Sequence, residues 1–175
     1  TEGLVGSEMC IRDSIWRECG WFENDDGPKG LDIFIDSWTT WVTDVHGEAE
    51  CAVSTLPGTM RYRETDLDFD LVAAVTTSRV ARKQGLASRL TAHAIADSVR
   101  RGLPMSTLGM FDQGFYNRLG FGTGPYLKII DFDPASLRPP IETKPRAPRR
   151  LTKDDWEAMH ANRLRRRRTH GGVCF

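Results

Sequence analysis

Cysteine and histidine are scarce in this 175-residue sequence, and neither type is spaced like a metal site. It has four residues of each. The cysteines (Cys10, Cys19, Cys51 and Cys174) form no Cys-x-x-Cys pair, and no two histidines stand at ligand spacing. We therefore expect no bound metal, and we expect free thiols in the reducing cytoplasm rather than a disulfide framework.

Long apolar runs are also missing. Apolar residues make up 39% of the chain, and no uninterrupted run approaches the roughly 18 residues needed to cross a membrane. The first residues lack the basic stretch and apolar stretch of a secretory signal. These absences predict a soluble, cytoplasmic protein with no membrane partner.

The sequence has no net charge, but its charges are unevenly distributed. Residues 1–78 carry 5 basic and 16 acidic side chains, a balance of −11. The balance is +4 for residues 79–137 (8 basic, 4 acidic) and +7 for residues 138–175 (11 basic, 4 acidic). An acidic first half would attract a cationic substrate, and a basic turn suits phosphate groups, although ordinary solvated surfaces explain the pattern as well.

The two ends of the chain differ from its middle. Residues 3–14 resemble translated sequencing-adapter read-through, and the first residue is Thr rather than Met. Five prolines between positions 134 and 148 indicate a linker, and Thr152 begins a capping-box pattern typical of a helix start. The expected organisation is an artefactual or disordered leader (1–22), an N-terminally truncated main domain (23–133), a proline-rich linker (134–150) and the first helix of a truncated second domain (151–175).

The middle of the chain reads as strand, turn, helix and strand. Apolar residues alternate from Leu67 to Val75, which predicts a strand, and they recur at helical spacing from Gly85 to Arg100. Gly102 is a typical helix stop, and residues 103–108 and 126–132 are short apolar runs that predict further strands. A strand–helix–strand crossover requires parallel pairing of the two strands that it joins.

A basic, glycine-containing turn lies between the central strand and the helix. It reads Arg82-Lys83-Gln84-Gly85-Leu86-Ala87. The first turn of a helix offers unpaired N–H groups, glycine permits close approach of the backbone, and the two cations add positive charge, so the turn can hold a diphosphate. Without Gly-Lys-Ser/Thr or further glycines it is neither a nucleotide-triphosphate P-loop nor a dinucleotide-binding turn. On its own, the motif could equally be a basic helix-capping loop.

About thirty residues later the chain carries Phe115-Tyr116-Asn117-Arg118-Leu119-Gly120-Phe121. A tyrosine held just before a Leu-Gly-Phe helix stop can protonate a leaving group. The alternative is a core aromatic residue beside a Gly-Phe turn.

Taken together, residues 75–87 and 115–121 resemble the GNAT superfamily of acetyl-coenzyme-A-dependent N-acetyltransferases. The resemblance covers about residues 38–133. Gly109 to Tyr116, the proline-rich linker and the helix bearing Trp156 resemble the multidomain enhanced-intracellular-survival type. The implied fold is α/β: a mixed, mostly antiparallel sheet whose central parallel strand pair splays around the acetyl-CoA site, with helices on both faces.

The resemblance also implies roles for individual residues. The backbone of Val75, Thr76 and Thr77 would flank the acetyl thioester where the central strand bulges. The amides of residues 82–87 would cradle the coenzyme A pyrophosphate. Phe111 and Asp112 would border the pantetheine arm, and Tyr116 would be the general acid.

Acid–base chemistry supports the role of Tyr116. A thiol titrates near about 8.5 and tyrosine near about 10, so Tyr116 is protonated at neutral pH and can donate to a leaving thiolate. The attacking amine, near about 10.4, must lose a proton. In the resembled family the base is a carboxylate at the far C-terminus, beyond a third domain that this chain lacks. Glu64, Asp68 and Asp70 are acidic candidates, but strand alternation places them on a solvent face.

The leading hypothesis is therefore an enzyme that transfers acetyl from acetyl-CoA to a primary amine of a small molecule or of lysine. A non-catalytic coenzyme-A-binding module with the same fold is the first alternative. A basic nucleic-acid-binding fragment is the second. Arg165 to Arg168 could contact nucleic acid, but they complement the dipole at a helix C-terminus, and we favour that reading. The sequence leaves a homo-oligomer open.

Overall fold

The computed structural model describes residues 14–21, 37–110, 114–124, 129–138, 147–166 and 168–174. The chain divides into two compact units. Unit 1 consists of Thr1–Phe121 and Arg168–Phe175, and unit 2 consists of Gly122–Arg167. The C-terminal residues thus belong to the first unit, whereas the sequence assigned residues 151–175 as a whole to a second domain. These units are defined by contacts, and the predicted domain ranges stay a prediction.

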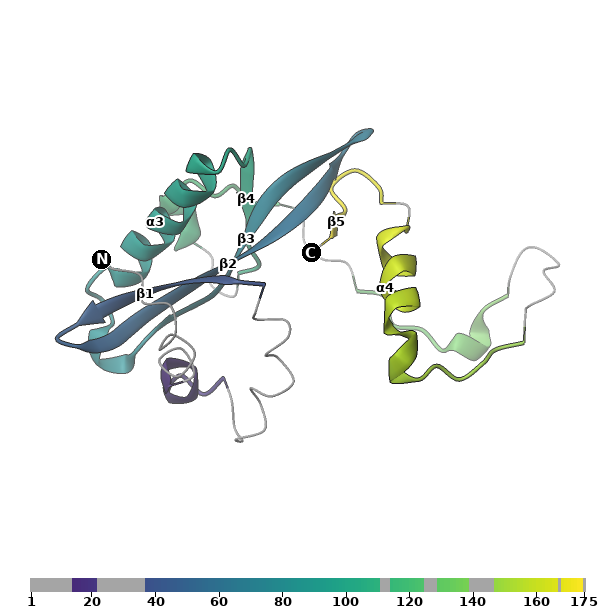
Figure 1. The fold of residues 1–175 in the computed structure, drawn as a ribbon, viewed down its shortest axis with the longest axis horizontal. Helices are drawn as coiled ribbons and strands as arrows, with labels where there is room; N and C mark the ends of the chain where they lie inside the picture. The colour runs from purple at the N-terminus through teal and green to yellow at the C-terminus, as the bar shows by residue number, and fades with distance from the viewer. Residues whose placement is uncertain are drawn as a thin grey trace. The chain divides into compact units, whose positions relative to one another are not determined.

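A five-stranded sheet forms the centre of unit 1 (Figure 1). The strand order is β1-β2-β3-β4, and β5 pairs with β2 on the same side as β1. All pairs are antiparallel except β3–β4. The strands are β1 (Thr39–Val45), β2 (Glu48–Tyr62), β3 (Thr65–Thr77), β4 (Met105–Thr107) and β5 (Val173–Cys174).

Strand β2 continues through Pro57. Proline has no N–H to donate and normally interrupts a central strand. Among the described residues, one edge of β2 is unpaired at this point, because the pairing with β1 ends at Thr55 and the pairing with β5 starts at Thr59. Pro57 is therefore tolerated at a gap in the ladder of hydrogen bonds.

A β-bulge interrupts β3 near its C-terminal end. Ala52 of β2 pairs with Thr76, whereas Ser54 pairs with Ala73, so β3 contains one extra residue between these pairs. Ala74 lies within the bulge and has a φ of 52°, in the left-handed region that residues with a side chain rarely adopt. The bulge lies at the residues that the family resemblance places beside the acetyl thioester.

The central parallel pair separates after a short contact. Strands β3 and β4 pair only from Phe69 with Met105 to Leu71 with Thr107, and β3 then continues alone on this edge to Thr77. Within the described residues, the backbone of β3 beyond Leu71 has no strand partner on the β4 side. The predicted fold class is confirmed: a mixed, mostly antiparallel sheet with a splayed parallel pair.

Helix α3 (Leu86–Arg100) covers one face of the sheet (Figure 1). Its apolar side chains pack on those of β2 and β3, and Gly102, with a φ of 80°, follows its C-terminal end as predicted. The buried core cluster consists of Cys51, Val53, Val72, Ala81, Leu86, Leu90 and Ala94.

A short helix at residues 14–18 lies on the opposite side of the sheet (Figure 1). Ile15 and Trp16 are each only 2% exposed, and the Trp16 ring meets the Trp38 ring edge to face at 6.5 Å. Burial of both sheet faces explains why residues 51–56 of β2 are buried without alternation. This helix falls inside the range that the sequence assigned to a leader, so at residues 14–18 the chain is folded structure.

Unit 2 contains little regular structure. Its elements are the 3-10 helices η4 (Pro134–Ser136) and η5 (Lys153–Asp155) and helix α4 (Trp156–Leu164). The capping box predicted at Thr152 is present. The strand predicted at residues 126–132 lies partly outside the described residues, and the described part, 129–132, is exposed and forms no strand.

The helices that the structure describes include none long and apolar enough to cross a membrane.

Candidate active site

The link between β3 and α3 is held by two glutamates. The backbone N–H of Ser78 donates to the carbonyl oxygen of Glu50 at 2.9 Å, and the Ser78 hydroxyl donates to the Glu50 carboxylate. The N–H of Arg79 donates to Oε1 of Glu18 at 2.6 Å. Strand β2 and the 14–18 helix thus fix the backbone just before the basic turn.

The basic turn is open to solvent. Residues 82–85 are exposed, while Leu86 is 5% exposed and anchors the start of α3 in the core. Within the described part of the chain, the backbone amides of residues 82–88 donate no hydrogen bond. Gly85 (φ 76°) and Lys83 (φ 63°) both have left-handed backbones, which turn the chain sharply into the helix. Unpaired amides at a helix N-terminus are an arrangement that can bind an anion.

Arg82 is partly committed to the protein itself. Its Nε donates to the carbonyl oxygen of Thr77 at 3.4 Å, which ties the turn to the end of β3. The same carbonyl accepts from the Cys19 thiol at 3.6 Å, and the Thr77 hydroxyl donates to Sγ of Cys51 at 3.4 Å. Thr77 is therefore a junction between the strand, the turn and the N-terminal helix.

Tyr116 begins the 3-10 helix η3 (Tyr116–Leu119), which Gly120 ends with a φ of 92°. Its half-buried ring lies edge to face against Phe115 at 4.9 Å and Phe121 at 6.1 Å. Burial raises the pKa of the Tyr116 hydroxyl above its usual value. Nothing in the described residues hydrogen-bonds to the hydroxyl. Burial therefore favours the protonated hydroxyl, which can donate a hydrogen bond.

One core cluster gathers the separate parts of the site. Val75 from the bulge, Ala87 from the first turn of α3, Leu108 after β4 and Phe121 after η3 all pack against it. Phe121 in turn contacts the Tyr116 ring. In the structure, the predicted turn, the bulge and the tyrosine helix therefore all pack against the same core cluster. Phe111 and Asp112 lie outside the described residues.

The expectation that Asp70 faces solvent is wrong. Asp70 is 1% exposed, accepts from the Ser98 hydroxyl at 2.5 Å and forms an ion pair with Arg101. Alternation fails here because α3 covers this face of β3. Because Oδ2 of Asp70 accepts from Ser98 and pairs with Arg101, this buried carboxylate is a poor general base. Asp68 and Glu64 are exposed as expected.

Sequence reasoning missed Glu18 and Glu50, which support the turn. Glu18 lay in the supposed leader, and a glutamate on an alternating strand carries no sign that it will bind a serine 28 residues later. Among the described residues, no group of three His, Cys, Asp or Glu side chains could hold a metal ion.

Residues 30–124 match the family model described as an acetyltransferase (GNAT) domain, which is more than half of the chain. The chain belongs to the GNAT acetyltransferase family. No curated protein is matched by the sequence.

Solved structures share the GNAT fold at low sequence identity. A conserved protein from Enterococcus faecalis, described as a probable N-acyltransferase, is 13% identical (TM-score 0.59) over 65% of this chain and 29% of its own. Eis1 from Mycobacterium abscessus is 14% identical (TM-score 0.55) over 69% of this chain and 30% of its own. A predicted acetyltransferase with acetyl-CoA from Clostridium acetobutylicum is 16% identical (TM-score 0.56) over 69% and 86%. The chain therefore spans less than a third of the first two proteins.

Proposed function

We propose that this GNAT domain transfers the acetyl group of acetyl-CoA to a primary amine of a small molecule or of lysine. The observation that carries the proposal is the open mouth of α3, where unpaired amides at residues 82–88 lie beside a bulged, one-sided strand. Family membership and the acetyl-CoA in the Clostridium acetobutylicum structure support the choice of donor.

In this proposal the chain binds the donor in two places. The amides of residues 82–87 hold the diphosphate, with charge added by Lys83 and Arg82. The free backbone edge of Val75, Thr76 and Thr77 flanks the thioester, through which acetyl-CoA carries the acetyl group. Phe111 and Asp112 are proposed to border the pantetheine arm.

Tyr116 is the proposed general acid. Its raised pKa keeps the hydroxyl protonated at neutral pH, and its proton passes to the sulfur as the C–S bond breaks. The amine nitrogen forms the new C–N bond and loses a proton to a base outside the residues assigned here.

Two measurements test the proposal. Calorimetric titration with coenzyme A tests binding, and thiol release from acetyl-CoA with a panel of small amines and a lysine peptide tests transfer. At saturating acetyl-CoA, Tyr116→Phe is expected to lower the rate about a hundredfold while coenzyme A affinity is kept. An unchanged rate would remove Tyr116 as the acid.

A chain that binds coenzyme A but acetylates no amine would favour the non-catalytic module. DNA binding that falls steeply with salt and is lost on deletion of residues 163–175 would favour the nucleic-acid-binding alternative. Membership of the enhanced-intracellular-survival type and a cytoplasmic location also stay predictions, the first supported by the shared fold with Eis1.

A further inference from the structure

The last described segment of the chain extends the sheet of unit 1. Beyond the end of β1, the outer edge of β2 pairs with β5 (Figure 1). Arg61 continues this pairing: its N–H donates to the Gly172 carbonyl oxygen at 2.9 Å, and its carbonyl accepts from the Gly171 N–H at 2.8 Å. The segment at residues 168–174 therefore occupies backbone groups that would otherwise form a bare sheet edge.

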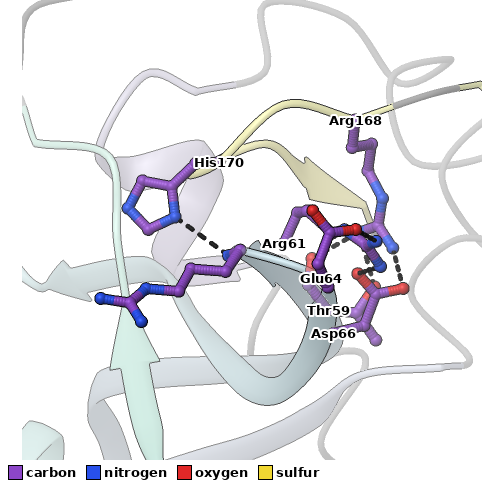
Figure 2. A network of polar contacts seen from close by, with 7 residues as sticks. Thr59, Arg61, Glu64, Asp66, Arg168 and His170 are labelled. Atoms are coloured by element: carbon purple, nitrogen blue, oxygen red, sulfur yellow. Dashed lines mark hydrogen bonds and ion pairs between the residues drawn. The ribbon is translucent and has the colours of Figure 1, made fainter.

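Arg168 anchors the segment through its side chain (Figure 2). Its guanidinium donates to the carbonyl oxygen and Oγ1 of Thr59 at 3.0 and 2.8 Å, and to Oδ2 of Asp66 at 2.6 Å. The side chain is only 20% exposed. Asp66 lies between two cations, since its other oxygen is 3.4 Å from the guanidinium of Arg61. Arg168 therefore adds three charge-assisted side-chain contacts to the backbone pairing between the segment and the hairpin.

His170 makes a second specific contact (Figure 2). Its Nδ1 accepts from the backbone N–H of Arg63 at 3.2 Å, and its ring lies 5.2 Å from the Tyr62 ring. Both partners are at the tip of the β2–β3 hairpin. The segment is thus held along the whole edge from Thr59 to Arg63.

Glycines allow the two backbones to come this close. A side chain at Gly58 would place its Cβ 2.9 Å from the carbonyl oxygen of Cys174 and 2.7 Å from the ring of Phe69. Gly171 has a φ of 82°, and a Cβ at Gly172 would meet the Thr169 carbonyl oxygen at 3.0 Å. The segment and the strand therefore fit each other at particular positions.

We propose that the β2–β3 hairpin edge (Thr59–Arg63 with Asp66) is a strand-addition site, occupied by this chain's own residues 168–174, in which residues 169–172 form a turn and β5 adds the strand. We call this pairing the hairpin latch. It joins residues 168–174 to unit 1 directly after the 46 residues of unit 2, Gly122–Arg167. The occupant is assigned within one molecule because the chain itself supplies it at high effective concentration. The proposal does not depend on acetyl transfer.

Amide hydrogen exchange in the full chain tests the latch. The Arg61 and Gly171 amides are expected to be protected, and Arg168→Ala to speed their exchange about tenfold by removing the anchoring contacts. Arg165→Ala is the matched control, since the side-chain hydrogen bond that Arg165 donates goes to Asn162. Asp66→Asn, which keeps the strand and removes one partner, should give a smaller increase.

A synthetic peptide with the sequence of residues 168–174 tests recognition. At millimolar concentration it is expected to restore protection of the Arg61 amide in the Arg168→Ala chain, whereas a peptide with alanine for the arginine should not. Equal exchange in wild type and Arg168→Ala would overturn the proposal. Protection that disappears on dilution of a dimer would also overturn it, and would assign the edge to a second copy.

Discussion

The two ends of α3 differ in whether their polar groups have hydrogen-bond partners. At the C-terminal end, the buried carboxylate of Asp70 is bound by Ser98 and Arg101, and Arg101 also donates to Asp97 at 2.9 Å. At the N-terminal end, the amides of residues 82–88 and the Lys83 side chain have no partner in the described residues. Paired buried groups stabilise a fold, while unpaired exposed donors can bind a ligand, so one end of the helix is structural and the other is the candidate binding end.

The largest expected effect is at the paired end. Asp70→Ala removes the common partner of Ser98 and Arg101 and should lower the free energy of unfolding by about 2–3 kcal/mol. Urea denaturation measures this loss. Asp68→Ala, an exposed change on the same strand, should cost less than about 0.5 kcal/mol. An equal loss of unfolding free energy in the two variants would contradict a stabilising role for the buried contacts of Asp70.

The open end should respond in ligand affinity instead. Arg82→Ala combined with Lys83→Ala is expected to weaken coenzyme A binding about tenfold, with little change in unfolding free energy. Calorimetric titration provides the measurement. Arg63→Ala combined with Arg100→Ala makes the same change in net charge away from the turn and should have a smaller effect. If both double variants weaken binding alike, the effect is one of overall charge.

Glu18 sharpens the comparison, because it supports the open end from outside the helix. Glu18→Ala deletes the acceptor for the Arg79 N–H and should raise the KM for acetyl-CoA about threefold while kcat is kept. Glu18→Gln retains an acceptor oxygen and is expected to restore most of the affinity. A fall in kcat with KM unchanged would contradict a positioning role.

The smallest effect concerns pH. Tyr116 contacts Phe121, which packs on the same core cluster as the first turn of α3. Burial raises the pKa of Tyr116, so its hydroxyl stays protonated above the usual tyrosine pKa of about 10. The rate at saturating acetyl-CoA should fall only above that pH, and Tyr116→Phe should show no such fall. The same shift affects stability. The contribution of Tyr116 to the free energy of unfolding is fully present below the tyrosine pKa of the unfolded chain, and it is lost as the pH rises through the higher pKa of the folded protein. A fall below pH 10 in both proteins would point to another group.

Local signals in the sequence were enough for the open end. The basic turn, the helical repeat from Leu86 and the glycine stops at 102 and 120 each depend on neighbouring residues, so they could be predicted. Family resemblance supplied the mixed sheet with its splayed parallel pair and the bulge of the central strand.

The paired end could not be predicted, since it depends on contacts between distant segments. Asp70 follows the alternation of an exposed strand and is buried because Ser98 and Arg101 arrive from α3. The helix at 14–18 and the return of residues 168–174 to β2 likewise depend on contacts that no local pattern encodes. Pro57 lies within a strand because of the gap between β1 and β5, which the local sequence does not encode.

The extra residue in β3 also changes which way its side chains point. Val72 and Val75 are three positions apart, which would put them on opposite faces of a regular strand, yet both pack on the same core. Deleting Ala74 would therefore invert the facing of residues 75–77, whereas replacing it would not. The facing of the residues proposed to flank the thioester is thus set by chain length at one position, and deletion of Ala74 should be more damaging than a substitution there.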